Sequence, residues 1–237
     1  MSRWDALLAV QEHDTTTEQL AHRRRTLPAR AELEQTMAQV VAVEARMVEV
    51  EAVRQELVRS QKRLEDEIAT MVDKAGQHDK SLYSGSISNP RDLQALQDEI
   101  AALRRRISQL EDQDLELMEQ IEPLESSLTR LAVERAALDE TAAGLRGRIA
   151  EDEVAIDAEL ASVQAERERI AADVDPGILS EYEALRPKLG GIAIARLVGG
   201  SCGGCHLSLS AVEVARLKKL PPEEPAYCEE CGRLLAR

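Results

Sequence analysis

The amino-acid sequence predicts a mainly α fold, in which a long antiparallel coiled-coil hairpin precedes a small C-terminal α+β domain. Three observations lead to this prediction. The 237 residues include no Phe, one Trp and three Tyr, so the large aromatic side chains that fill deep cores are nearly missing. Leucine recurs every seven residues through the middle of the chain, and all four cysteines lie within the last 36 residues. We therefore expect long paired helices and a separate small domain.

The charge and hydropathy of the chain exclude several classes of protein. Asp and Glu outnumber Lys and Arg by 44 to 30, which gives a formal net charge of -14. Most of such a surface repels phosphate, so we do not expect nucleic acid to bind over the whole molecule. No secretory signal and no run of about 18 apolar residues occurs. We therefore expect no membrane contact and a cytoplasmic location.

The most regular pattern predicts one long helix from residue 96 onwards. A second apolar row follows these leucines by four residues, and the alternating spacing of four and three makes the narrow seam of a coiled coil. Pro123 falls inside this pattern and should kink the helix. The leucine row consists of Leu96, Leu103, Leu110, Leu117, Leu124, Leu131, Leu138 and Leu145.

An earlier seam, Val40–Met71, predicts the partner helix. Gly76 suits the position just beyond a helix, where a positive φ costs glycine nothing. Asn89 can cap the next helix, with Pro90 as its first residue. The sequence therefore predicts that the chain turns in a tip loop at about residues 77–89.

These elements divide the chain into two predicted domains. Residues 1–175 form the antiparallel coiled-coil hairpin, in which Pro28 separates a short first helix from the long one. Residues 176–237 form the small α+β domain.

Docking the two seams around the tip loop predicts their register. With Ile68 against Ile100, the numbers of paired residues add up to 167 or 168 along the hairpin. Arg54, the one cation of the first seam, then lies opposite Asp114 of the second. An isolated charge in an apolar seam is costly, so an Arg54–Asp114 pair would fix the register. In the alternative, both side chains extend out of the seam into water.

The C-terminal domain is predicted to contain a helix, a strand and a second helix. Asp175 and Pro176 suit the cap and first position of the first helix. The alternating, β-branched residues 192–198 predict a strand, and a helix is expected from Ser210 to Leu220.

The cysteines form two C-x-x-C pairs separated by 22 residues. This spacing is typical of a structural zinc site, in which each pair supplies two thiolates from one tight turn. Four thiolates leave no open position for a catalytic water. A redox-active dithiol is the competing interpretation, and His206 is an alternative ligand to Cys205. The expected ligands of one structural Zn²⁺ are Cys202, Cys205, Cys228 and Cys231.

Several segments resemble the bacterial C4-type zinc-ribbon, coiled-coil hairpin family. Residues 82–100, LYSGSISNPRDLQALQDEI, resemble the motif at its hairpin tip, and the two cysteine pairs followed by Gly232-Arg233-Leu234 resemble its ribbon. Leu27-Pro28 and Glu181-Tyr182-Glu183 also agree, whereas His206 stands where many zinc knuckles have glycine. The resemblance implies a helical hairpin carrying a zinc ribbon with four cysteine ligands. It also implies a role in nucleic-acid binding or regulation, since relatives are linked to transcription factors and RNA handling.

The distribution of charge suggests where nucleic acid could bind. Residues 186–237 carry a net charge of +3, from eight Lys or Arg and five Glu, whereas residues 1–185 carry -17. Alternatively, these cations are solvated side chains near the negative end of a helix. The candidate phosphate contacts are Arg216, Lys218, Lys219 and Arg233.

Two surfaces of the hairpin are candidates for binding a protein partner. The first is a basic band near the tip, where the predicted register places Lys62 and Arg63 opposite Arg104, Arg105 and Arg106. The second consists of three apolar side chains in the tip loop. Alternatively, the band is a solvated flank of the coiled coil, and the tip residues close the end of the seam. The candidate tip residues are Leu82, Tyr83 and Ile87.

Together with the resemblance, these features favour a non-enzymatic adaptor that binds nucleic acid or a protein of the transcription or RNA-handling machinery. One alternative is a regulator that inserts its coiled coil into the secondary channel of RNA polymerase. Such regulators need clustered acidic residues at the tip, where this chain alternates acidic with basic residues. Another alternative is a structural spacer or oligomer, and the sequence leaves the oligomeric state open. Four dispersed His and no phosphate loop argue against an enzyme.

Overall fold

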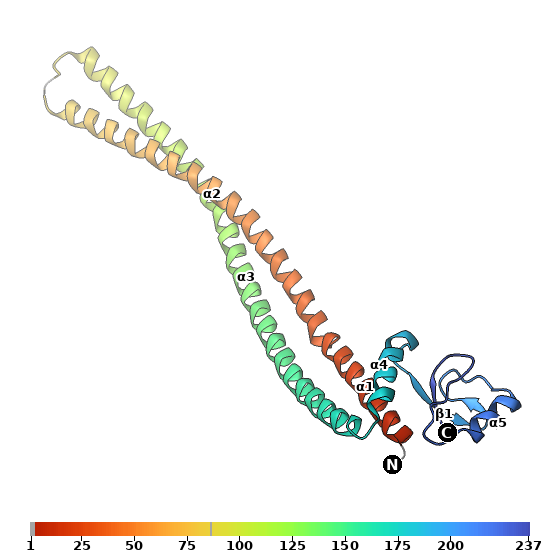
Figure 1. Ribbon diagram of the computed structural model, residues 1–237. Helices are drawn as coiled ribbons and strands as arrows, with labels where there is room; N and C mark the ends of the chain where they lie inside the picture. The colour runs from red at the N-terminus through yellow and green to blue at the C-terminus, as the bar shows by residue number, and fades with distance from the viewer. Residues whose placement is uncertain (1–2, 86) are drawn as a thin grey trace. The chain divides into compact units, whose positions relative to one another are not determined.

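The computed structural model describes residues 3–85 and 87–237, and it confirms the mainly α fold (Figure 1). None of the helices in these residues combines the length and the apolar character needed to cross a membrane. The helices are α1 (Arg3–Arg25), α2 (Pro28–Tyr83), α3 (Pro90–Ala171), α4 (Pro176–Leu185), the 3-10 helix η1 (Arg186–Leu189) and α5 (Ala211–Lys219). The strands are β1 (Ile194–Val198), β2 (Ser201–Cys202) and β3 (Leu234–Ala236).

The chain packs as two compact units. The hairpin unit is Glu32–Leu145, and the terminal unit combines Met1–Ala31 with Arg146–Arg237. The N-terminal helix and the end of α3 thus pack with the C-terminal elements. This grouping differs from the division at residue 175 expected from the sequence, because contacts between distant segments, rather than the chain order, define it.

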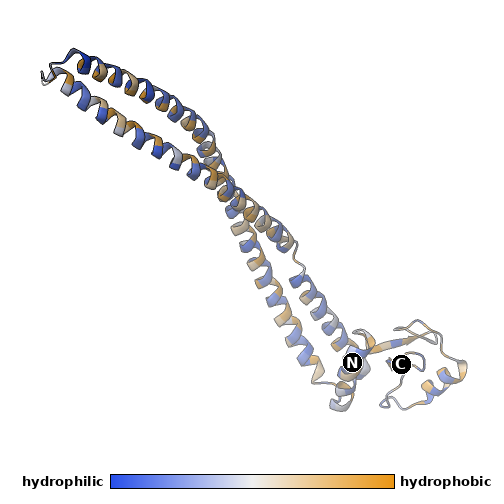
Figure 2. Cartoon of the chain, turned by 90° about the horizontal axis from the view of Figure 1, so that it is seen from above, coloured by the Kyte–Doolittle hydropathy of each residue, from blue (hydrophilic) through white to orange (hydrophobic). Residues whose placement is uncertain are grey.

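In the hairpin unit, α2 and α3 run antiparallel and bury the predicted seam between them. Apolar residues recur at intervals along both helices (Figure 2). Burying this narrow stripe is what stabilises two helices that have no deeper core. Pro123 lies inside α3, which continues as one helix beyond it. The buried seam residues include Val40, Val43, Ile100, Leu110, Ile121, Leu131 and Ala142.

The tip loop lies later in the chain than predicted. Helix α2 continues through Gly76 to Tyr83, and the glycine with a positive φ, at 72°, is Gly85. A glycine inside a helix costs about 1 kcal/mol, which the burial of the neighbouring Ala75 helps to offset. The predicted cap is confirmed, because Oδ1 of Asn89 accepts a hydrogen bond from the Arg91 amide at 3.0 Å.

The later loop also changes the register of the two helices. Lys74 pairs with Glu99 at 2.8 Å, and Arg135 pairs with Glu44 at 3.0 Å. The numbers in these pairs add up to 173 and 179, so the predicted value of 167 or 168 is wrong. The register of an antiparallel pair follows from the midpoint of its turn. Moving that midpoint towards the C-terminus raises every sum.

The predicted Arg54–Asp114 pair is also wrong. Arg54 donates from Nε and Nη2 to the carboxylate of Glu51, both at 2.9 Å, and from Nη1 to Glu125 at 3.3 Å. The hydrogen bonds from Arg54 hold the pKa of Glu51 at about 2. Among the described residues, the buried Oδ1 of Asp114 has no hydrogen-bond partner. Arg54 therefore pairs with carboxylates outside the seam, the nearest of them one turn away on its own helix.

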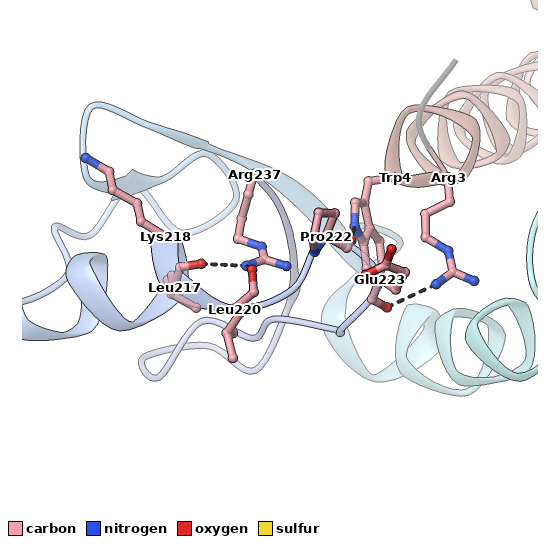
Figure 3. A pocket seen from close by; sticks show the side chains of 8 residues that line it. All are labelled: Arg3, Trp4, Leu217, Lys218, Leu220, Pro222, Glu223 and Arg237. Carbon is pink, nitrogen blue, oxygen red and sulfur yellow. Dashed lines mark hydrogen bonds between the residues drawn. The ribbon is translucent and has the colours of Figure 1, made fainter.

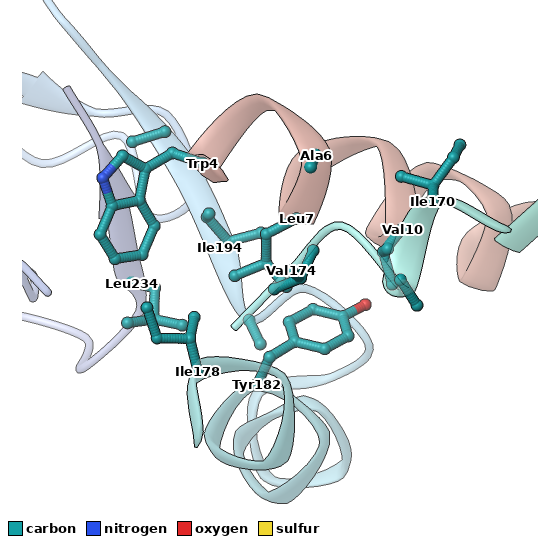
Figure 4. Packing of buried hydrophobic residues seen from close by; sticks show 13 residues of the cluster. Trp4, Ala6, Leu7, Val10, Ile170, Val174, Ile178, Tyr182, Ile194 and Leu234 are labelled. Atoms are coloured by element: carbon teal, nitrogen blue, oxygen red, sulfur yellow. The ribbon is translucent and has the colours of Figure 1, made fainter. Parts of the chain in front are cut away.

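The core of the terminal unit joins α1 to the C-terminal elements. Figure 4 shows side chains of α1 facing those of α4, β1 and β3. Tyr182 is fully buried, and its hydroxyl donates to Asp14 of α1 at 2.8 Å. Burial, and then this hydrogen bond, raise the pKa of Tyr182. The cluster includes Trp4, Leu7, Val10, Ile170, Val174, Ile178, Tyr182, Ile194 and Leu234.

Three short strands form the sheet of the terminal unit, in the order β2-β1-β3. Strand β1 pairs antiparallel with β2, which places Leu197 opposite Cys202. It pairs in parallel with β3, which places Ile194 opposite Leu234. The predicted strand at 192–198 is thus confirmed, with two residues fewer at its start.

The structure confirms the predicted cap at Asp175 and adds a second cap at Ser210, where the sequence predicted only a helix. Oδ1 of Asp175 accepts from the amides of Gly177 and Ile178, at 3.0 and 3.2 Å, and begins α4. The Ser210 hydroxyl accepts from the Glu213 amide at 3.1 Å and begins α5. Each cap satisfies amides that have no partner within the helix.

Gln11 links α1 directly to the backbone of β1. Its Oε1 accepts from the amides of Ala193 and Ile194, at 2.7 and 2.9 Å, and its Nε2 donates to the Ile194 carbonyl at 2.9 Å. Gln11 is only 9% exposed, so water cannot readily replace these bonds. The side chain therefore completes the hydrogen bonding at the start of the central strand.

We expect Gln11→Leu to lower the free energy of unfolding of the terminal unit by about 2–4 kcal/mol, because it leaves buried backbone groups without partners. Denaturant unfolding of the zinc-loaded protein, monitored by hydrogen exchange of the β1 amides, measures this change in the free energy of unfolding. Gln19→Leu is the matched control, since Gln19 is exposed on the same helix. Equal stability of the two variants would contradict the assigned role of Gln11.

Candidate metal centre

Two similar turns present the four cysteines. In the first, the His206 amide donates to the Cys202 carbonyl at 2.8 Å; in the second, the Gly232 amide donates to the Cys228 carbonyl at 2.8 Å. Cys202 and Cys228, the first cysteine of each turn, are buried, and the second cysteine of each is half-buried. The sheet positions both turns, because Cys202 belongs to β2 and the second turn leads into β3.

The sulfur atoms fit one tetrahedral zinc ion. The Sγ atoms of Cys202 and Cys231 are 3.9 Å apart, and those of Cys205 and Cys228 are 3.8 Å apart. Zn–S bonds of about 2.3 Å give a tetrahedron with edges of about 3.8 Å. All four Sγ atoms lie within 4.8 Å of one another, and none forms a disulfide. These cysteines hold one structural zinc ion, as the sequence predicted.

His206 is not part of this cluster. In the described part of the chain, the four cysteines alone form a group able to hold a metal, and His206 is exposed. Its φ is 61°, close to the 71° of Gly232 at the equivalent place in the second turn. A left-handed backbone at this position explains why glycine is common in such turns.

Close packing of the backbone explains the two glycines inside the first turn. The Gly203 amide donates to the Arg196 carbonyl at 2.8 Å, and a Cβ on Gly203 would lie 2.9 Å from that oxygen. A Cβ on Gly204 would lie 2.5 Å from Cδ of Arg233. The first turn can therefore approach β1 and Arg233 only without side chains at these positions.

Arg233, a predicted phosphate contact, is occupied inside the terminal unit. Its Nε donates to the Ile192 carbonyl at 2.8 Å, and its Nη2 donates to the Leu189 carbonyl at 3.0 Å. Burial alone would raise the pKa of the Cys231 thiol, but hydrogen bonds from the backbone and side chain of Arg233 bring it to about 7. In contrast, burial raises the pKa of Cys228 to about 12. Arg233 thus supports the metal site and the segment before β1.

The remaining predicted phosphate contacts lie on α5. Nε of Arg216 donates to Glu213 at 2.7 Å, and Glu213 is only 4% exposed, so this cation is largely neutralised. Lys218 and Lys219 are exposed, and no carboxylate among residues 3–85 and 87–237 pairs with them. Only these two lysines of the predicted set remain available to an anion.

Sequence reasoning missed a group of residues that holds the end of the chain. The Arg237 guanidinium donates to four carbonyls, among them that of Leu217 (Figure 3). Trp4 donates from Nε1 to the Pro222 carbonyl at 2.8 Å. These residues line a hollow of about 530 Å³. No spacing pattern marks them, since their partners are backbone carbonyls of segments distant in sequence.

The basic band predicted on the hairpin does not form as expected. Arg104 pairs with Asp79 at 2.7 Å, and Arg106 pairs with Glu67 at 3.4 Å. Lys62 pairs with Asp66 at 3.0 Å on its own helix, and Nη2 of Arg63 donates to the Ser60 hydroxyl at 3.3 Å. Carboxylates of the facing helix thus pair with Arg104 and Arg106, and one on its own helix pairs with Lys62, whereas Arg63 and Arg105 have no ion pair among the described residues.

The tip residues, in contrast, include a prominent exposed aromatic ring. Tyr83 is 84% exposed, whereas Leu82 and Ile87 are half-buried. Leu82 and Tyr83 line a hollow of about 500 Å³ together with Arg104 and Arg105. The tip thus presents an exposed aromatic ring beside a hollow of mixed polarity, in which Arg104 is paired with Asp79.

We expect His206→Gly to raise the free energy of unfolding of the terminal unit by about 0.5–1 kcal/mol, because it removes the left-handed strain of a residue with a Cβ. Thermal unfolding of the zinc-loaded protein measures the change. Ser208→Gly, two residues later, is the control and should instead destabilise, because its φ is not positive. A lower stability for His206→Gly would contradict the argument.

We expect chelation of zinc to unfold the sheet and both cysteine turns, because the metal-binding free energy is part of the folding free energy of so small a domain. Hydrogen exchange should lose its protection in residues 192–237 and keep it in residues 96–131. Metal analysis of the untreated protein should find one zinc per chain. Unchanged protection of the sheet after complete zinc removal would contradict a structural role for the metal.

Comparisons with known proteins agree with this architecture. The family model described as CT398-like coiled-coil hairpin domain matches residues 10–190, and that of the C4-type zinc ribbon domain matches residues 201–235. An uncharacterized protein of Mycobacterium tuberculosis is 32% identical over 98% of this chain and 94% of its own length. An uncharacterized protein of Mycobacterium leprae is 25% identical over 93% of this chain and 94% of its own length.

Two solved structures share the fold. A structure from Mycobacterium smegmatis has a TM-score of 0.88 at 23% identity and covers 99% of this chain and 97% of its own. CT398 from Chlamydia trachomatis has a TM-score of 0.69 at 22% identity and covers 98% of this chain and 96% of its own. With four thiolates at zinc-ribbon spacing and a helical hairpin, the chain belongs to the family of CT398-like coiled-coil hairpin proteins with a C4-type zinc ribbon.

Proposed function

We propose that this protein is a non-enzymatic cytoplasmic adaptor that binds a protein of the transcription or RNA-handling machinery through the tip of its hairpin. The observation that carries this proposal is the exposure of Tyr83, at 84%, beside a hollow that it lines with Leu82. Exposed aromatic side chains that line a surface hollow are typical anchors of protein interfaces. Arg105 borders the hollow and, unlike Arg104, has no ion pair among the described residues, so it would favour acidic groups on the partner.

The chemistry of the zinc site supports an adaptor over an enzyme. Four thiolates at tetrahedral distances fill the coordination sphere and leave no position for an activated water. The site can therefore hold the fold together, but it offers no Lewis-acid position to a substrate.

The charge pattern at the tip argues against a regulator of the RNA polymerase secondary channel. Asp79, one of the few carboxylates there, pairs with Arg104 at 2.7 Å. Glu99 accepts from Lys74 at 2.8 Å. Carboxylates neutralised in this way are poorly suited to handle metal ions at a polymerase active site.

Binding of nucleic acid by the terminal unit is a second candidate function. Lys218 and Lys219 favour it, because they lie in the last turn of α5 without a partner carboxylate among the described residues. The pairing of Arg216 and the internal role of Arg233 reduce this surface to two cations. We therefore expect weak, salt-sensitive binding of phosphate here.

A crosslinked pull-down with the full-length, zinc-loaded protein tests both functions. We expect Tyr83→Ala to remove the protein partner and to leave any bound nucleic acid in place, because the exposed ring is the anchor. Lys218→Glu/Lys219→Glu should do the reverse. Val133→Ala is the matched control, since Val133 is 67% exposed elsewhere on the hairpin. Recovery of the same proteins with Tyr83→Ala as with Val133→Ala would contradict the tip proposal.

A further inference from the structure

A second apolar stripe runs along α2, separate from the seam that packs on α3. It follows the same alternating spacing of three and four residues as a coiled-coil seam. Its residues are all exposed, and Val41 and Val48 are 62% and 69% exposed. The stripe consists of Ala38, Val41, Ala45, Val48 and Ala52, and the polar Gln55 takes the next position of the same spacing.

The stripe forms one wall of a groove. Val48, Ala52 and Gln55 of α2 line a hollow of about 710 Å³ together with Leu128, Thr129 and Ala132 of α3. Small side chains at every seventh position, as at Ala38, Ala45 and Ala52, allow another helix backbone to approach closely. A third helix laid in the groove would therefore contact both α2 and α3, as in a three-stranded coiled coil.

The charges beside the stripe determine what kind of helix fits. In a coiled coil, the positions next to the seam pair with those of the partner helix and select it. Here these positions hold Glu44 and Glu51 on one side, Glu49 and Glu56 on the other, and no Lys or Arg. The hairpin unit as a whole has 24 Asp and Glu against 13 Lys and Arg, a net charge of -11.

Nearby cations neutralise these carboxylates only in part. Glu44 pairs with Arg135, yet its side chain stays 45% exposed. Glu56 pairs with Arg59 and stays 66% exposed. Glu51 pairs with Arg54 at 2.9 Å and stays 34% exposed, whereas Glu49 has no ion pair among the described residues. The rim of the groove thus presents carboxylates to any incoming helix.

We propose that this groove binds an amphipathic helix of a partner protein whose small or aliphatic seam is flanked by Lys and Arg. A second copy of this chain fits less well, because it would bring the same glutamates against one another, and like charges at these positions repel. The groove adds a second protein-binding surface to the proposed adaptor. It does not depend on the tip.

Three synthetic helical peptides test the proposal against the full-length, zinc-loaded protein. The first has an Ala/Leu seam with Lys at the flanking positions, the second has the same composition in scrambled order, and the third has Glu at the flanking positions. We expect only the first to bind, in a titration followed by fluorescence anisotropy. Val48→Lys/Ala52→Lys should weaken the binding of the first peptide about tenfold or more, because the two side chains fill the groove and add positive charge to it.

A charge exchange makes the test stricter. Glu49→Lys/Glu56→Lys should weaken the Lys-flanked peptide and create binding of the Glu-flanked one. Val72→Lys is the matched control, because Val72 is 49% exposed on α2 outside the stripe. This variant should bind the Lys-flanked peptide as tightly as the unchanged protein does. Tyr83→Ala should also bind normally, which separates failure of this proposal from failure of the tip proposal. Circular dichroism checks that every variant keeps its helices.

Three results would overturn the proposal. The scrambled peptide could bind as tightly as the ordered one, which would show attraction by net charge alone. The groove variant could bind as tightly as the Val72→Lys control. Light scattering could show a dimer that Val48→Lys/Ala52→Lys dissociates, which would make a second copy the occupant.

Discussion

The burial of one narrow apolar seam between α2 and α3 is the interaction on which the hairpin unit depends. With almost no aromatic residues, the sequence cannot fill a deep core, so two helices must shield each other. Val40, Val43 and Leu110 are buried in this seam, whereas Asp114 enters it with one oxygen unpaired among the described residues. Because the seam uses only one face of each helix, the remaining faces are free for other contacts, and on α2 one of them is apolar.

The terminal unit solves the same shortage of apolar mass differently. Its core contains most of the few aromatic side chains that the chain has, including Trp4 and Tyr182. Gln11 completes the hydrogen bonding of β1 from a different helix. Zinc then joins two turns that are rich in glycine and contribute little apolar surface of their own. Metal, sheet and N-terminal helix are thus mutually dependent.

The distribution of ion pairs narrows the surfaces that can recognise a partner. Several basic residues that stand out in the sequence are used within the fold, as Arg233 and Arg104 show. The apolar features that remain exposed include Tyr83 at the tip and the stripe through Val48 on α2. Such surfaces suit protein partners better than they suit phosphate, which needs cations without competing carboxylates.

The sequence by itself determined the coiled-coil hairpin, the caps at Asn89 and Asp175, and the four zinc ligands, because each depends on residues within a few positions of one another or on a repeated spacing. Only the tertiary structure decided the register, the partners of Arg54 and Arg233, and the role of Gln11. These depend on which distant segments meet. A glycine within a helix costs only about 1 kcal/mol, which is too little to decide from the sequence whether α2 ends at Gly76 or continues through it. Because α2 continues through Gly76, every pairing along the hairpin differs from the predicted one.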